Sequence, residues 1–269
     1  MKKLATALVS AAAIMTMSTT AFAAENPAEV FDRVMEKNNT IQSAEIQSGV
    51  HSVILAKDVI PDGQMKVHMA MHAEMDMQDT TDLKYLAQIA SSILGQDSYS
   101  QVFYTDGYYY VDTNGDKLKY PMPLEQIISS VQTGVNTSNM ESSYMKGISL
   151  NEVNGKRVLA YEANPKKLNK NVKEALGTVM NTLGTDVNLD MNIQEMKGAY
   201  VLDDNDYIIY MTNYIVYNME VLDQPMTCIT LMETEVQNPG EPVVVTLPST
   251  DGYEDLIGLY DGVIESEVE

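Results

Sequence analysis

The longest regular pattern of apolar and polar residues in the chain runs from Met65 to Gln78. Every odd position of this stretch is apolar, and every even position except Ala70 is polar. Such period-two alternation is typical of a long β-strand with one buried and one solvated face. The apolar face is nearly all methionine, a flexible side chain that fills irregular apolar space. We therefore expect other segments of the chain to pack against this face.

The stretch Ser43–Lys57 predicts the partner of this methionine strand. Its apolar side consists of alternating or nearly alternating positions: Ala44, Ile46, Val50, Ile54 and Ala56. Residues 58–64 contain a proline and a glycine, which turn the chain back between the two strands. Pairing the two apolar sides leaves His51 on the outer face together with His68 and His72.

Four segments have apolar residues at helical spacing, at 28–38, 80–96, 123–135 and 166–183. The first and last begin with Asn26-Pro27 and Asn164-Pro165, a capping residue followed by a proline suited to the first helical position. Asp106-Gly107, Asn114-Gly115 and Asn154-Gly155 are two-residue hairpin turns. They predict a three-stranded meander over 99–120 and a hairpin that joins 143–152 to 156–163.

Further strands are predicted over 186–202, 207–222, 226–236 and 243–247. Nearly every link between strands is short, so the sheet is predicted to be mainly antiparallel, with the helices against one face. The expected fold class is α+β: a curved, mainly antiparallel β half-barrel wrapped over a few helices.

The N-terminus has the three parts of a secretory signal. Lys2 and Lys3 precede an apolar run over Leu4–Met17, and Ala21-Phe22-Ala23 forms a small-residue cleavage site. We expect a signal peptide over residues 1–23, a single domain over 24–250 and an acidic C-terminal tail over 251–269. The residue directly after the cleavage site is not a cysteine, so it cannot carry a lipid. No later stretch is apolar enough for stable membrane insertion. The predicted location is therefore secreted, or extracytoplasmic.

The composition narrows the choice of partners. The chain has 17 basic and 38 acidic residues and a formal net charge of −21, which disfavours binding to nucleic acid. Cys228 is the only cysteine, so an internal disulfide is impossible, and its apolar surroundings in the sequence predict a buried, inert thiol. Tyrosine and methionine supply most of the bulky apolar side chains.

Several stretches resemble a family of uncharacterised secreted proteins of Gram-positive bacteria. These are Tyr104–Tyr110, Lys117–Pro121, the long strands over Met191–Val236, and the ending with Val243–Leu247, Pro248 and Tyr253. That family is similar in architecture to the LolA-like and LppX-like lipoprotein carriers, unclosed half-barrels with helices in the mouth and an apolar cavity. The resemblance implies binding of a lipid or other amphiphile without catalysis, and it supplies no catalytic residues.

We predict that the ligand cavity is lined by the apolar faces of the first two strands. The candidate residues are Met65, Val67, Met69, Met71, Met75, Met77, Ile46, Val50 and Ile54. The same residues would be buried in a closed core, and the sequence leaves both possibilities open. The alternative function is a cell-surface protein-interaction module with a closed core and no small ligand; its protein partner is not identified by the sequence.

The sequence gives only weak support for a metal site and none for a hydrolase. The pairs Met69-Ala70-Met71 and Met75-Asp76-Met77 could bind Cu(I) through thioethers, but a buried strand needs the same alternation. One histidine of the second strand could join His51 and Glu74 at zinc, and Asp203–Asp206 could hold calcium weakly. Asp112–Asp116 lacks the pattern of an EF-hand. Hydrolase motifs such as G-x-S-x-G and H-E-x-x-H are absent from the sequence. We predict no catalytic residue, no metal site and no cofactor.

Overall fold

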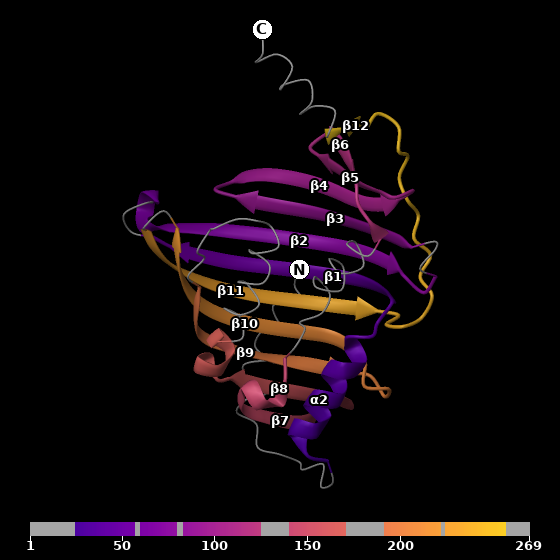
Figure 1. Ribbon diagram of the computed structural model, residues 1–269. Helices are drawn as coiled ribbons and strands as arrows, with labels where there is room; N and C mark the ends of the chain where they lie inside the picture. Colours follow the sequence, from indigo (N-terminus) through magenta and orange to yellow (C-terminus); the bar gives the residue numbers. More distant parts are fainter. Residues whose placement is uncertain are drawn as a thin grey trace. The chain divides into compact units, whose positions relative to one another are not determined.

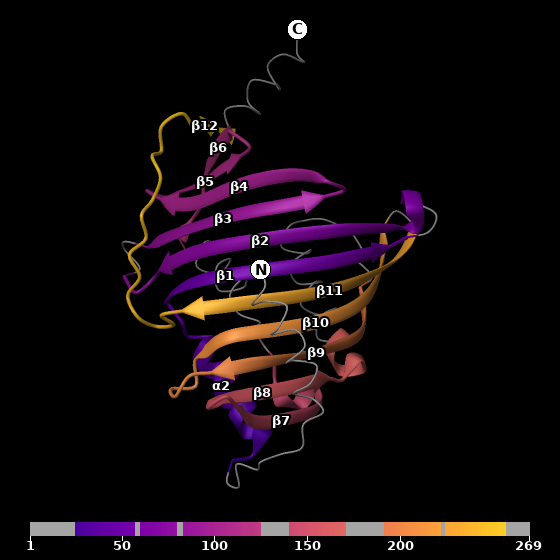
Figure 2. The same ribbon diagram turned by 180° about the vertical axis from the view of Figure 1, so that it is seen from behind.

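We analysed a computed structural model of the chain, which describes residues 25–56, 60–79, 83–124, 140–170, 191–221 and 224–256. Its labelled elements are helix α2 (Pro27–Asn38), the short turns η1 (Pro61–Gly63) and η2 (Ser142–Tyr144), and strands β1 (Ser43–Leu55), β2 (Gln64–Asp76), β3 (Lys84–Ile93), β4 (Gln96–Thr105), β5 (Tyr108–Thr113), β6 (Asp116–Pro121), β7 (Met145–Val153), β8 (Lys156–Ala163), β9 (Asn192–Leu202), β10 (Ile208–Val221), β11 (Gln224–Gln237) and β12 (Glu254–Asp255). Figures 1 and 2 show these elements from opposite sides.

The strands are hydrogen-bonded in the order β12-β6-β5-β4-β3-β2-β1-β11-β10-β9-β8-β7, so the sheet is open. The neighbouring pairs from β3 to β6 and from β7 to β11 are antiparallel, and β12 pairs in parallel with β6. The predicted fold class, a mainly antiparallel open sheet with few helices, is confirmed.

The chain divides into two compact units that interleave along the sequence. Unit 1 comprises Met1–Asn38, Gly49–His68 and Asn139–Glu235, and unit 2 comprises Asn39–Ser48, Met69–Ser138 and Val236–Glu269. The predicted boundaries of a signal peptide, one domain and a tail stay predictions.

Helix α2 of unit 1 begins at the predicted cap. The Asn26 side chain accepts a hydrogen bond from Ala28 N at 3.1 Å, which satisfies one free amide of the first turn, and it donates one to the Glu29 side chain at 3.2 Å. At the other end Asn38 donates to Val34 O at 2.8 Å and accepts from Ile208 N at 2.9 Å. The same asparagine therefore ends the helix and joins it to β10.

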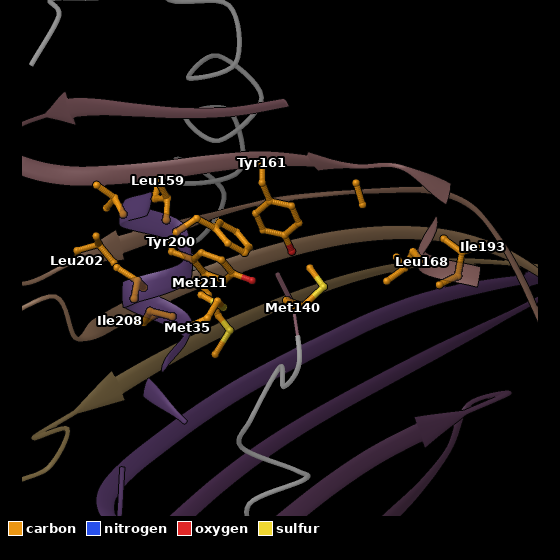
Figure 3. Packing of buried hydrophobic residues seen from close by; sticks show 14 residues of the cluster. Met35, Met140, Leu159, Tyr161, Leu168, Ile193, Tyr200, Leu202, Ile208 and Met211 are labelled. Atoms are coloured by element: carbon orange, nitrogen blue, oxygen red, sulfur yellow. The ribbon is translucent and has the colours of Figure 1, made fainter. Parts of the chain in front are cut away.

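The inner side of α2 packs on β7 to β10 and forms the core of unit 1 (Figure 3). Val30, Phe31 and Val34 have no exposed surface. Phe31 lies edge-on to Tyr161 of β8, with ring centroids 5.8 Å apart, and Tyr161 stacks on Tyr200 of β9 at 5.2 Å. Fully burying a large apolar side chain of this kind stabilises a fold by about 1.5–3 kcal/mol, so this contact fixes the helix on the sheet.

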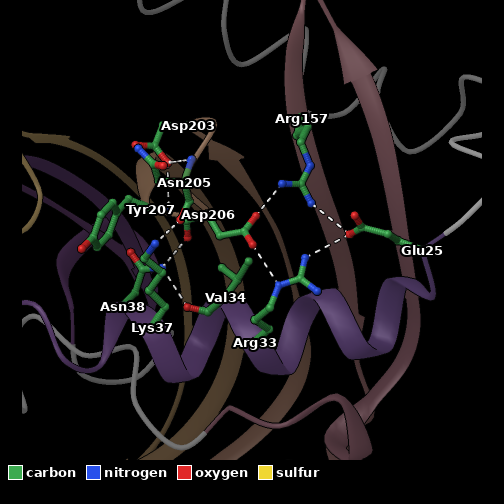
Figure 4. Close-up of polar contacts among 10 residues, drawn as sticks. All are labelled: Glu25, Arg33, Val34, Lys37, Asn38, Arg157, Asp203, Asn205, Asp206 and Tyr207. Carbon is green, nitrogen blue, oxygen red and sulfur yellow. Dashed lines mark hydrogen bonds and ion pairs between the residues drawn. The ribbon is translucent and has the colours of Figure 1, made fainter.

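A network of charged side chains holds the outer side of α2 to the loop before β10 (Figure 4). Asp206 accepts hydrogen bonds from Arg33 Nε at 2.9 Å and from Arg157 Nη1, and both arginines also pair with Glu25. Burial alone would raise the pKa of Asp206, but the hydrogen bonds and charges of Arg33 and Arg157 outweigh it, so the pKa is lowered. The network links Glu25, which precedes α2, to Arg33 of the helix and to Arg157 of β8.

A glycine makes room for a polar contact across three strands of unit 1. Tyr161 of β8 pairs with Gly198 of β9, which pairs in turn with Asn213 of β10. The Tyr161 hydroxyl passes over Gly198 and donates to Asn213 Oδ1. A Cβ atom at Gly198 would lie 2.5 Å from Asn213 Oδ1 and 2.8 Å from the Tyr161 hydroxyl, so only glycine fits.

Unit 2 contains the predicted meander. The turns Asp106-Gly107 and Asn114-Gly115 have positive φ angles at both residues, which suits the tight hairpins joining β4, β5 and β6. Phe103 stacks on Tyr110 with centroids 4.6 Å apart. Tyr253 lies edge-on to both rings, and Val245 is buried in the same cluster. The segment over 243–253 therefore covers one face of the meander.

Two sequence-based predictions of secondary structure are wrong. The stretch 80–96 was predicted to be helical, but Lys84–Ile93 is strand β3. Its Leu86 packs in the cluster around Phe103, while Ala87 on the opposite face is also fully buried. A strand buried on both faces lacks clean alternation, and its apolar residues fall by chance at helical spacing.

The second error is the strand predicted over 243–247, where the structure has no strand pairing. These residues pack through their side chains instead. The helix predicted over 123–135 lies almost wholly outside the described residues, as does most of the one over 166–183. Residues 165–170 are helical, with Lys166 N donating to the Asn164 cap at 3.2 Å.

Candidate ligand-binding face

We call the side of unit 1 that faces α2 the inward face. Met211, Ile215 and Tyr217 of β10 lie on it, because they pack in or against the core beneath α2. Their partners on β11 are Thr234, Thr230 and Cys228. Thr230 Oγ1 is 2.9 Å from Ser52 Oγ of β1, which places Ser52 on the same face. Since strand side chains alternate, Val50 and Ile54 share that face.

The position of β2 follows from its histidine. His68 contacts His51, and both alternate with the inward residues of their strands. The predicted outer location of these two histidines is confirmed. Met65 and Val67, the neighbours of the outward His68 and Lys66, therefore lie on the inward face.

Burial changes along the inward face of unit 1. Tyr161, Leu159 and Tyr200 on β8 and β9 are almost or completely buried beneath α2. Most of the inward residues nearer the middle of the strand order are only half-buried, although Cys228 among them is 1% exposed. The half-buried ones are Ile215, Tyr217, Thr230, Met232, Val50, Ile54, Met65 and Val67. The face thus changes from a closed core to a partly exposed apolar surface.

In unit 2 the methionines of β2 divide in the same way. Met75 and Met77 are 1% and 3% exposed, and Ile46 of β1 is 5% exposed, so these three candidate residues are core. Met71 is half-buried, and Met69 is 40% exposed. The alternation predicted the face correctly for the whole strand but not this gradient, which depends on how far other segments cover each position.

A few polar groups interrupt the apolar inward face of unit 1. Besides the Ser52–Thr230 contact, the Tyr217 hydroxyl lies near Cys228 and Thr230; burial, and then Cys228, raise the pKa of Tyr217. Cys228 is 1% exposed and its Sγ is 3.7 Å from Met219 Sδ, so the predicted buried thiol is confirmed. Such scattered hydroxyls on an apolar surface can orient a ligand that has one polar end.

Unit 2 contains an aromatic row that sequence analysis did not find. Tyr85, Tyr104, Tyr109 and Tyr120 are successive cross-strand partners on β3 to β6. Tyr104 is buried and donates to Met122 O at 3.2 Å, and the other three are half-buried. Burial, and then the neighbours Tyr85 and Tyr120, raise the pKa of Tyr109. The row is a second partly exposed apolar surface edged with hydroxyls.

The aspartates of the acidic turns accept hydrogen bonds from backbone amides or pair with arginines of the protein itself. Asp203 Oδ1 accepts from the amides of Asn205 and Tyr207 at 2.9 and 2.8 Å, and Asp206 pairs with two arginines. Asp112 Oδ1 accepts from Gly115 N at 2.9 Å. Within the described ranges, no three or more His, Cys, Asp or Glu side chains converge as a metal site would require.

A family model described as a family of unknown function, DUF6612, matches residues 26–248. The chain belongs to this family. A search of curated proteins finds no match. None of the helices among the described residues is long and apolar enough to cross a membrane.

Solved structures similar to this DUF6612 protein include two mycobacterial ones. LprF from Mycobacterium bovis is 10% identical with a TM-score of 0.36, and the match covers 83% of this chain and 97% of LprF. The lipoprotein LppX from Mycobacterium tuberculosis is 10% identical with a TM-score of 0.36, covering 82% and 100%. The ywiB protein from Bacillus subtilis is 11% identical with a TM-score of 0.23, covering 74% and 96%. The predicted likeness to LppX is confirmed.

Proposed function

We propose that this protein is secreted and binds a lipid or other amphiphile on the inward face of β10, β11, β1 and β2, without catalysing a reaction. The observation that carries the proposal is the change of burial along one continuous face of unit 1. Beneath α2 the face is a closed core, whereas Val50, Ile54, Met65 and Val67 keep part of their surface accessible.

The chemistry of these side chains favours an acyl chain over a rigid ligand. Covering apolar surface with an alkyl chain gains about 25 cal/mol for each Å² removed from water. Thioethers adapt to chains of different length and shape, and this surface carries Met65 and Met232 in unit 1. The hydroxyls of Ser52, Thr230 and Tyr217 supply polar partners for a headgroup or carboxylate.

The proposal divides the candidate cavity residues by role. Met75, Met77 and Ile46 belong to the core of unit 2. Met65, Val67, Val50 and Ile54 are the residues that would contact ligand on unit 1, whereas Met69 and Met71 are accessible methionines of unit 2. The signal-like segment over residues 1–23 supports a place outside the cytoplasmic membrane, and we extend the proposal to a Gram-positive cell envelope.

The test compares one charge on each face of β1 within unit 1. Val50→Glu places a carboxylate among the proposed contact residues, and Gly49→Glu adds the same charge at the preceding position, on the opposite face, where a Cβ meets nothing within 4 Å. Binding of a fluorescent fatty acid should weaken by about tenfold or more in Val50→Glu and stay near wild type in Gly49→Glu, because only the first desolvates a charge against ligand.

Native mass spectrometry of the secreted protein after gentle purification provides the second measurement. A co-purifying acyl-chain species is the expected result. Wild-type protein that neither carries such a species nor binds fatty acid or detergent would show that the inward face is not an amphiphile site.

A protein-interaction module at the cell surface is the second candidate function, and the tip of the β3–β4 hairpin favours it. Ile93 and Leu94 are 44% and 67% exposed there. Leu94 has φ 53°, a conformation that a bulky residue adopts at a cost. An apolar side chain kept exposed in this way is typical of a contact surface. Capture of a specific partner by a protein that binds no amphiphile would favour this function.

A further inference from the structure

The outward face of unit 1 carries a pair of histidines that amphiphile binding does not use. His51 of β1 and His68 of β2 face each other across the two strands, with their Nδ1 atoms 2.7 Å apart. The ring centroids are 4.9 Å apart and the planes cross at 72°. Both residues are exposed, so a solute can reach the two nitrogens directly.

We propose that His51 and His68 form a binding site for a divalent first-row transition-metal ion, with Cu²⁺ preferred over Ni²⁺ and Zn²⁺. Imidazole nitrogen is a common ligand of these ions, and Cu²⁺ has the highest affinity among them for a given nitrogen site. The two residues bring the same ring nitrogen, Nδ1, to within hydrogen-bond distance of each other.

The separation of the nitrogens favours a square-planar or tetragonal ion. Two nitrogens at about 2.0 Å from one metal lie about 2.8 Å apart when they subtend a right angle, and about 3.3 Å apart at the tetrahedral angle of zinc. The observed 2.7 Å is a hydrogen-bond distance. To share one ion, both rings must turn so that their lone pairs point at the metal, and the nitrogens must separate less for Cu²⁺ than for Zn²⁺.

Loading the site requires a change of tautomer. At 2.7 Å one Nδ1 must donate a hydrogen to the other. A metal needs the lone pairs of both atoms, so the ring that carries its hydrogen on Nδ1 moves it to Nε2 through water. The neutral pair then loses no net proton.

The hairpin holds the pair in place before metal arrives. Ala56 N donates to Gly63 O at 3.1 Å and Gly63 N donates to Ile60 O at 2.9 Å, which closes the connection between β1 and β2. Among the described residues no third His, Cys, Asp or Glu converges on the pair, so water completes the coordination. Lys66 shares this face, but the formal net charge of −21 raises the local concentration of cations.

The test uses the purified protein without an affinity tag, titrated with CuCl₂, NiCl₂ and ZnCl₂ and followed by calorimetry and by electron paramagnetic resonance of Cu²⁺. The variants are His51→Ala and His68→Ala. The chain has three histidines, so His72→Ala is a matched control with the same loss of one imidazole. In unit 2, His72 Nε2 lies 3.3 Å from Glu74 Oε1.

Wild type and His72→Ala should bind one Cu²⁺ per chain, with a spectrum split by two equivalent nitrogens. Either variant of the pair should bind at least about tenfold more weakly and lose that splitting, because one imidazole gives no chelate. His68→Gln, which keeps a polar side chain of similar size, guards against misfolding, and circular dichroism checks each variant. Equal Cu²⁺ affinity in wild type and His51→Ala, or loss of binding in His72→Ala, would overturn the proposal.

Discussion

At the scale of single residues, two glycines of unit 1 have opposite roles. Because Gly198 has no side chain, the Tyr161 hydroxyl can pass over it to Asn213. A Cβ at Gly198 would also lie 2.5 Å from Thr212 O. At Gly49, on β1, a Cβ would meet nothing within 4 Å. Replacing each glycine by alanine therefore separates two effects: the clash of an added Cβ, which occurs only at Gly198, and the loss of backbone freedom, which occurs at both positions.

We predict that Gly198→Ala lowers the free energy of unfolding by about 1–3 kcal/mol, because the added methyl group displaces backbone and a buried hydrogen bond. Gly49→Ala should leave stability unchanged or raise it by up to about 1 kcal/mol, since alanine reduces the freedom of the unfolded chain. Urea unfolding curves decide this. Equal effects of the two substitutions would mean that the Tyr161–Asn213 contact does not need Gly198.

The methionines of β2 give a second pair of matched substitutions. Met75→Ala removes a side chain that is 1% exposed and should cost roughly 2–5 kcal/mol. Met71→Ala removes a half-buried one and should cost clearly less, while altering preference among fatty acids of different chain length. Denaturant midpoints and fatty-acid binding are the measurements. A full core penalty at Met71, without any ligand binding by wild type, would indicate a packed core along the whole strand.

At the scale of elements, α2 is fixed to unit 1 by apolar packing on one side and by ion pairs on the other. The Asp206 side chain is 16% exposed and pairs with both Arg33 and Arg157. Ion pairs of this kind contribute more than isolated surface pairs because several charges share one partly buried partner.

We predict that Asp206→Asn costs about 1–2 kcal/mol at pH 7. The folded pKa of Asp206 is lowered from its ordinary value of 3.8, so the native state binds fewer protons than the unfolded state just below that pH. The stabilisation is complete above about pH 4 and is lost as pH falls toward the folded pKa. Wild type and variant should therefore converge in acid.

Urea midpoints at pH 7 and pH 3 measure this convergence. Glu25→Gln is the control, because it removes only the exposed end of the same network and should cost under about 1 kcal/mol. A stability difference between wild type and Asp206→Asn that does not change with pH would contradict the assignment.

Much of unit 2 could be predicted from its turns, but strand β3 and the unpaired segment over 243–247 could not. The two hairpin turns alone align Tyr104 with Tyr109 and Tyr109 with Tyr120, as the observed register does. Tyr85 is not added by this reasoning, because the spacing of apolar residues over 80–96 predicts a helix there. Alternation assigns the faces of β2 correctly, but a local pattern carries no information about which distant segments cover Met75 and leave Met69 exposed.

At the scale of the whole molecule, the charge balance sets how stability responds to salt. With a formal net charge of −21, like charges repel throughout the folded chain, and they are closer together there than in the unfolded chain. This repulsion acts over the Debye length, which shrinks from about 30 Å at 0.01 M to about 3 Å at 1 M salt.

We predict that the melting temperature rises by several degrees between about 0.01 M and 0.5 M NaCl, because screening relieves this repulsion. The control is the same titration near pH 4.3, the isoelectric point of the sequence, where the effect of salt should largely vanish. A melting temperature that falls with added salt at pH 7 would mean that specific ion pairs outweigh the general repulsion.

The cluster around Phe103 is completed by Val245 and Tyr253, which lie far along the chain. A chain that emerges from a ribosome N-terminus first exposes Leu86, Phe103 and Tyr110 long before these residues arrive. Contacts so distant in sequence also form slowly. Unit 2 can thus finish folding only after Tyr253 has been synthesised, and a chain that stops before it leaves these apolar side chains open to aggregation and proteases.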